Sequence, residues 1–154
     1  MYICEEQQAN LLRSRYIQAF IDQSREQYQT EIAYDGKYVN RFYYSGYLWD
    51  CIRDVKVISK EECLLTLDRV EHFYALWDVH LYPRTAECKI CEYPRDAVLK
   101  LHKDEYRDLL LHLPEDIYFF DDSFSWSVVL THEEVDGAAW CLSAKPFLEK
   151  AEAY

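Results

Sequence analysis

Three groups of residues in this 154-residue chain have types and spacings that could do chemistry. In Thr131-His132-Glu133-Glu134 an imidazole stands beside two carboxylates, and it could act as a base or hold a metal ion. Asp121-Asp122 is a carboxylate pair of the kind that general acid–base catalysis uses. Cys88-Lys89-Ile90-Cys91 brings two thiols to the spacing of metal ligands. Each group also has a purely structural interpretation.

The thiol pair lacks the partners that a structural zinc ion needs. Such a site takes four ligands, and the sequence has no second CxxC pair. His80 and His102 could complete the set, but they lie eight and eleven residues from the pair, which is not a standard spacing. A redox role would need a strand–helix context, whereas residues 82–96 are predicted to be a loop. We therefore expect no bound metal, no cofactor, and reduced thiols in a cytoplasm.

The other two groups fit turns and strand ends at least as well as catalysis. Asp is favoured in hairpin turns because its side chain bonds to the backbone two residues on, which explains Asp121 and Asp122. His132 fits a strand end beside a solvated acidic turn. The sequence contains no GxSxG, HExxH, P-loop or GxGxxG motif. We assign no catalytic residue, and a small hydrolase or nucleotide-processing enzyme using His132 with Glu133 or Asp121 stays the alternative.

Residues 113–133 are predicted to be a β-hairpin that organises the sheet. Two apolar runs flank a polar break at residues 121–123, and Pro114 suits the position just before a strand. In the second arm the faces alternate: Trp126, Val128, Leu130 and His132 share one, and Ser125, Ser127, Val129 and Thr131 share the other. Trp126 and Trp77 are expected to be buried.

Periodicity, turn residues and one capping box predict the remaining elements. The capping box is Ser59-Lys60-Glu61-Glu62. The expected helices cover 5–31, 59–70, 103–112 and 147–153, and the expected strands cover 73–81, 97–101 and 138–144. Residues 38–52 are predicted to be an aromatic strand or loop followed by a short helix from Tyr47. The order indicates a single α+β domain over 1–154, with an antiparallel sheet and helices packed mainly on one face.

Charge and composition exclude several classes of function. The formal net charge is −11, and no Lys or Arg occurs between Asp108 and Ala144, where eight acids do. Such a surface repels nucleic acid and attracts a basic protein partner. The aromatic content argues against disorder. No apolar run approaches the ~20 residues of a membrane span, and the first residues do not look like a signal peptide, so we expect a cytoplasmic location.

Three segments resemble small, acidic bacterial proteins of the toxin-immunity type. The main one is Leu113–Glu133, and Phe73–His80 and Gly46–Asp50 are similar to the same group. The resemblance implies a cytoplasmic bacterial protein with an inhibitory-binding role, and it supplies no catalytic residue.

The predicted function is that of a cytoplasmic protein-binding module, an immunity-type inhibitor of a basic toxin domain. Clustered acids would steer and complement a basic partner, and aromatic side chains among them would provide apolar anchors. The expected contact residues are the acids Asp121, Asp122, Glu133, Glu134 and Asp136, with Tyr118 and Phe124 as anchors.

Overall fold

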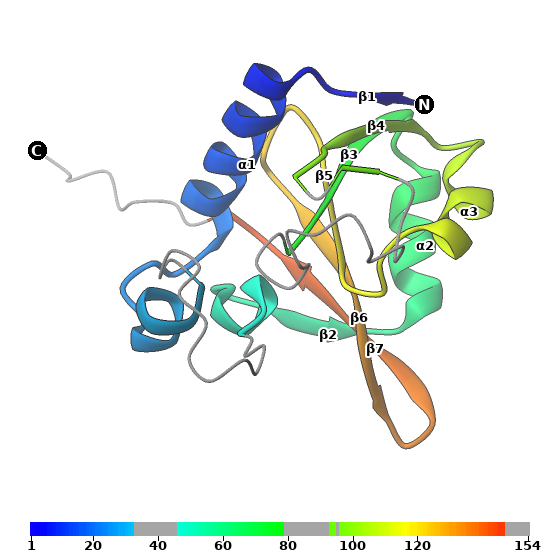
Figure 1. Cartoon of the computed structure of the whole chain (residues 1–154). Coiled ribbons are helices and arrows are strands. Elements are labelled where there is room, and N and C mark those ends of the chain that lie inside the picture. Colours follow the sequence, from blue (N-terminus) through cyan, green and yellow to red (C-terminus); the bar gives the residue numbers. More distant parts are fainter. Residues whose placement is uncertain (33–45, 79–92, 95, 147–154) are drawn as a thin grey trace, which may run out of the picture.

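A computed structural model describes residues 1–32, 46–78, 93–94 and 96–146. In this part of the chain an antiparallel sheet has the strand order β1-β4-β3-β5-β6-β7-β2 (Figure 1). The strands are β1 (Tyr2–Ile3), β2 (Lys56–Ile58), β3 (His72–Trp77), β4 (Leu99–His102), β5 (Ile117–Phe120), β6 (Ser127–Val135) and β7 (Ala138–Ala144). The α+β class and the antiparallel sheet predicted from the sequence are therefore confirmed.

The predicted hairpin lies inside this sheet. Ile117 of β5 is opposite Leu130 of β6, and Phe120 is opposite Ser127. β7 pairs with the other edge of β6, as expected for residues 138–144. Asp136 and Gly137 connect β6 to β7 with φ angles of 53° and 77°. Positive φ at both central residues is characteristic of a type I′ turn, which Asp-Gly favours because its twist matches the strands.

Helices cover both faces of the sheet, because its inner strands are apolar on both sides. On one face Phe73, Ala75 and Trp77 pack with helices α2 (Lys60–Asp68) and α3 (Tyr106–Leu109). On the other, Tyr74 and Leu76 pack with helix α1 (Glu6–Phe20). The sequence predicted helices mainly on one face of the sheet. In the structure α2 and α3 share one face, and α1 packs its apolar side against the other.

The first helix is shorter than predicted. The apolar spacing favours a helix over 5–31, but α1 ends at Phe20 because Ile21 is extended and bridges to Ile52. The Asp22 backbone N–H donates to the Cys51 carbonyl (2.7 Å), which fixes this departure from helix geometry. A separate π-helical turn follows at Tyr28–Ile32. The pairing of Ile21 with Ile52 thus ends the helix at Phe20, although the apolar spacing typical of a helix continues further along the sequence.

Other local predictions hold where the structure describes them. Ser59 and Glu62 form the predicted capping box at the start of α2. A 3-10 helix at Leu48–Cys51 matches the short helix expected from Tyr47. Residues 103–112 give α3 and a 3-10 turn in place of one helix. The predictions for 79–92 and 147–153 lie outside the described residues.

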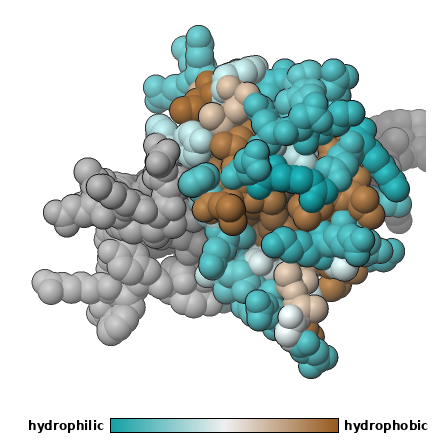
Figure 2. All heavy atoms as spheres, turned by 90° about the vertical axis from the view of Figure 1, so that its right-hand side faces the viewer, coloured by the Kyte–Doolittle hydropathy of each residue, from teal (hydrophilic) through white to brown (hydrophobic). Residues whose placement is uncertain are grey.

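The two predicted core tryptophans differ in burial. Trp77 is completely buried among the side chains under α2 and α3, as expected. Trp126 is only half-buried and packs at the margin of the same cluster. Figure 2 looks onto the side of α2 and α3 and shows apolar side chains in a band between hydrophilic ones. Leu65 of α2 is among the exposed apolar residues of the chain.

Candidate functional site

The end of the β6–β7 hairpin projects beyond the rest of the sheet (Figure 1). Neighbouring strands pair with β6 only over Ser127–Leu130 and with β7 only over Cys141–Ser143. Residues 131–140 therefore form a two-stranded arm, and residues 132–138 within it are exposed. We call residues 131–140 the acidic arm.

The acidic arm carries three exposed carboxylates and no Lys or Arg. Glu133, Glu134 and Asp136 lie around its tip, and Val135 between them is 54% exposed. Asp121 and Asp122 do not join them, because they lie in the turn before β6, at the opposite end of the strand. A nine-residue strand is about 30 Å long at ~3.3 Å per residue, so the predicted acids form two separate groups.

Asp121 and Asp122 have local bonding roles in their turn. Oδ1 of Asp121 accepts the Ser123 backbone N–H (2.9 Å), which is the side-chain-to-backbone bond expected of Asp in a turn. The Tyr74 hydroxyl donates to Oδ1 of Asp122 (2.9 Å). These contacts favour the structural interpretation of the pair over a catalytic one.

Tyr118 and Phe124 are core residues and not surface anchors. Tyr118 has no exposed surface, and Phe124 is 7% exposed and packs on Phe120. The sequence prediction was wrong about these two because it took aromatic residues close to acids in the sequence to share their surface. In β5 both faces are buried, so neither alternate position is available to a partner.

Asp116 organises the base of the acidic arm. Its Oδ1 accepts hydrogen bonds from the backbone N–H of His132 (3.1 Å) and from Nε1–H of Trp49 (3.1 Å). The same oxygen lies 2.9 Å from Nδ1 of His132. One carboxylate thus joins the segment before β5, the 3-10 helix and β6. Sequence reasoning missed this role, because nothing in the pattern separates Asp116 from the acids around it.

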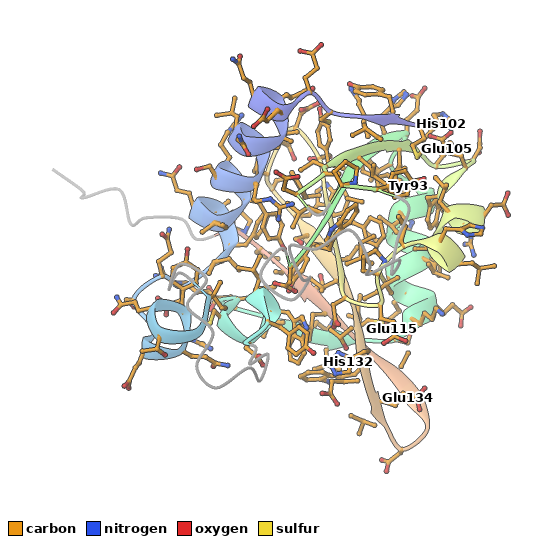
Figure 3. All side chains as sticks on the ribbon, in the orientation of Figure 1. Tyr93, His102, Glu105, Glu115, His132 and Glu134 are labelled. Carbon is orange, nitrogen blue, oxygen red and sulfur yellow. The ribbon has the colours of Figure 1, made fainter. Side chains whose placement is uncertain are left out.

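His132 lies between two carboxylates. Besides Asp116 at Nδ1, Oε1 of Glu133 is 3.3 Å from its Nε2. The hydrogen bond with Asp116 raises the pKa of His132, and the charges of Asp116, Glu133 and Glu115 act in the same direction. Figure 3 shows His132 with Glu115 and Glu134 at this end of the molecule. The surrounding carboxylates therefore favour the charged form of this imidazole.

The side chain of His132 also leaves the face that strict alternation predicts. The pairing of β6 with β7 shifts register between Leu130 and Glu134, and within this irregular stretch the Thr131 hydroxyl donates to the Trp140 carbonyl. Extra residues in one strand of a pair re-aim the side chains that follow, as they do at a β-bulge. His132 therefore packs against Tyr47, with 5.0 Å between ring centroids.

An aromatic cluster supports this base. Tyr47 stacks on Trp49 at 5.1 Å with an interplanar angle of 15°, and Trp140 meets Trp49 edge-on at 5.6 Å. Tyr47 and Trp140 are half-buried, so part of each ring remains accessible beside the arm. Aromatic rings are enriched at protein interfaces, and charged groups lie mainly at the rim around them.

A buried carboxylate fixes the 3-10 helix that carries Trp49. Asp78 accepts the Leu48 backbone N–H (2.9 Å) and the Tyr118 hydroxyl (2.7 Å), and that hydroxyl in turn accepts the Trp49 backbone N–H (2.9 Å). Burial raises the pKa of Asp78 to about 7. In the sequence, the signal for this role is a single acid at the end of the apolar run 73–77. These hydrogen bonds hold the backbone that carries Trp49 in place beside the acidic arm.

The fold and this site together define an acidic α+β protein with a projecting, negatively charged β-arm. Comparisons of the chain with protein-family models, with curated proteins and with solved structures find no match. Within the described residues, no helix is long and apolar enough to cross a membrane. Cys88, Cys91 and His80, which were considered as metal ligands, lie outside the described residues.

Proposed function

We propose that this protein is a binding module that neutralises a basic protein partner, as an immunity-type inhibitor neutralises a toxin domain. The observation that carries the proposal is the acidic arm, whose exposed carboxylates Glu133, Glu134 and Asp136 stand clear of the sheet. A cation-free run from Asp108 to Ala144 contains it. A basic partner would approach this end of the molecule first.

The arm and its base offer the two parts that an effective interface needs. The carboxylates at the tip accelerate encounter with a positively charged surface and disfavour acidic competitors. Val135 and the half-buried rings of Tyr47 and Trp140 supply apolar area beside them. Affinity in such interfaces comes mainly from a few well-packed aromatic contacts, and rim charges act mainly on the association rate.

The test compares two variants with the same change in net charge. One is Glu133→Gln/Glu134→Gln/Asp136→Asn, in which Asn suits the positive φ of the turn. The control is Glu5→Gln/Asp96→Asn/Asp108→Asn, three exposed acids outside the acidic arm. A basic partner captured from the source cells is identified by mass spectrometry, and its association with each protein is followed by surface plasmon resonance at two salt concentrations.

The arm variant should associate at least about tenfold more slowly than the wild type at low salt, and the gap should shrink at high salt. The control should associate at nearly the wild-type rate. Equal loss of rate in both variants would show that only net charge matters and would refute a role for the arm. Failure to capture any basic protein would refute the proposal as a whole.

The alternative is a small hydrolase or nucleotide-processing enzyme. The observation in its favour is the Asp116–His132 pair, since a carboxylate at Nδ1 orients an imidazole for proton transfer. Asp121, its other predicted participant, is at the far end of β6, and Glu133 occupies the Nε2 side. A hydrolytic activity towards esters or nucleotides that is lost in His132→Asn would establish this alternative.

A further inference from the structure

A second group of ionisable side chains lies far from the acidic arm. Figure 3 shows His102 and Glu105 at the opposite end of the molecule from His132. His102, the last residue of β4, pairs directly across the sheet with His72, the first residue of β3. Their rings meet edge-to-face with 5.0 Å between centroids. Two imidazoles thus stand side by side where the β3–β4 ladder ends.

Glu71 adds a carboxylate to this histidine pair. Its backbone carbonyl accepts the Lys103 N–H (3.1 Å). This hydrogen bond joins the residue before β3 to the residue after β4, next to the paired histidines. One ligand atom from each of Glu71, His72 and His102 lies within 4.8 Å of the other two. On a tetrahedral zinc ion, ligand atoms are roughly 3.3–3.5 Å apart. Rotation of the side chains can close this difference, and Glu71 and His72 are exposed.

The third ligand is already held in place by its surroundings. The His102 backbone N–H donates to Oε1 of Glu105 (2.9 Å), and its Nδ1 accepts the Asp104 backbone N–H (3.2 Å). A carboxylate oxygen of Asp104 is 3.4 Å from the same Nδ1. Metal-binding histidines commonly donate the N–H of their second nitrogen to a carboxylate, which orients the ring and strengthens its donation to the metal. When Nε2 of His102 holds the ion, Nδ1 carries the proton, and the Asp104 carboxylate is the group placed to accept it.

We propose that Glu71, His72 and His102 bind one divalent transition-metal ion of the zinc class, with water completing the coordination. Two imidazoles and one carboxylate form a ligand set that zinc accepts at sites with an open position, and imidazole also suits Ni²⁺ and Cu²⁺. This assignment revises the expectation that the chain holds no metal. It places the ion on a cross-strand histidine pair and does not involve Cys88 or Cys91. It is independent of the proposed binding function.

A bound ion would join the start of β3 to the end of β4. All three ligands come from segments that the folded sheet brings together, since Glu71 and His102 are distant in sequence. The ion therefore binds the folded state selectively and should raise the melting temperature. This gives a readout that does not depend on any activity of the protein.

The experiment uses untagged full-length protein with Cys88→Ser/Cys91→Ser, so that these two thiols cannot compete for the ion. After treatment with a chelator, Zn²⁺ is titrated by calorimetry, and Co²⁺ is added to read tetrahedral coordination from its visible absorption. We expect one ion per chain. His72→Asn and Glu71→Gln should each lower the affinity at least tenfold and abolish the rise in melting temperature. His112→Asn, which changes an exposed histidine elsewhere, is the matched control and should bind as the parent does.

Three results would overturn the assignment. The parent protein could fail to bind Zn²⁺ at up to millimolar concentration. The His72→Asn/His102→Asn variant could bind as tightly as the parent. Stoichiometric binding could occur only when Cys88 and Cys91 are restored, which would place the ion on the thiol pair. Circular dichroism of each variant verifies that a loss of binding is not a loss of fold.

Discussion

Asp78 is the group whose ionisation should govern the stability of this fold near neutral pH. Its side chain is 1% exposed, and burial raises its pKa from 3.8 to about 7. Hydrogen bonds from the Leu48 N–H and the Tyr118 hydroxyl favour the charged form, but desolvation outweighs them. At pH 8 Asp78 is therefore ionised in the folded protein, where its charge is less well solvated than in the unfolded chain.

The sign and size of the effect follow from the two pKa values. Between pH 3.8 and about 7 the folded state keeps a proton that the unfolded state has released. The free energy of unfolding therefore falls as pH rises through this range, and it levels off above pH 7. A shift of about three pH units corresponds to about 4 kcal/mol, of which about 2.5 kcal/mol falls between pH 5 and pH 8.

Urea denaturation of the wild type and of Asp78→Asn at pH 5 and pH 8 tests this reasoning. Asn is neutral and keeps an oxygen that accepts a hydrogen bond. The two proteins should have similar stability at pH 5, and the variant should be more stable by about 2.5 kcal/mol at pH 8. The raised pKa of His132 also makes stability fall with rising pH, but it acts in both proteins and cancels. If Asp78→Asn lowers the free energy of unfolding relative to the wild type by the same amount at pH 5 and at pH 8, the argument is refuted.

Two further substitutions test the core and the helix start, each by denaturant unfolding. Trp77→Ala should lower the free energy of unfolding by about 3–5 kcal/mol, because the side chain is fully buried, and the half-buried Trp126→Ala should cost less. A larger loss for Trp126→Ala would contradict the observed burial. Ser59→Ala should cost about 1 kcal/mol by removing the cap of α2, whereas the exposed Ser125→Ala should have little effect. No difference between these two serine variants would speak against the capping box.

The sequence predicted the elements whose signals are local. The hairpin of β5 and β6 follows from two apolar runs around a polar break, and α2 begins at Ser59 because its capping box needs only four residues. The Asp136-Gly137 turn is equally local. These signals are reliable because the interactions that produce them lie within a few residues of each other.

Three of the failures involve contacts between distant segments. α1 stops at Phe20 because Ile21 pairs with Ile52, which no periodicity within 5–31 reveals. Tyr118 was expected at the surface but is buried under the 3-10 helix that carries Trp49. The base of the acidic arm depends on Asp116, whose partners Trp49 and His132 lie in segments far apart in the sequence. Sequence patterns predict which residues share one face of a helix or strand and where turns lie. They do not show which of these faces pack against each other in the fold.

The strand order also determines when the sheet can form during synthesis. β1 pairs with β4, where Tyr2 is opposite Lys100, and β2 pairs with β7, where Lys56 is opposite Ser143. The early strands must therefore wait for partners made much later, and loops of this length are slow to close. Until β7 leaves the ribosome, β6 and β2 lack their shared neighbour. The nascent chain thus passes through a stage in which apolar strands have unpaired edges, which is when chaperones are most useful.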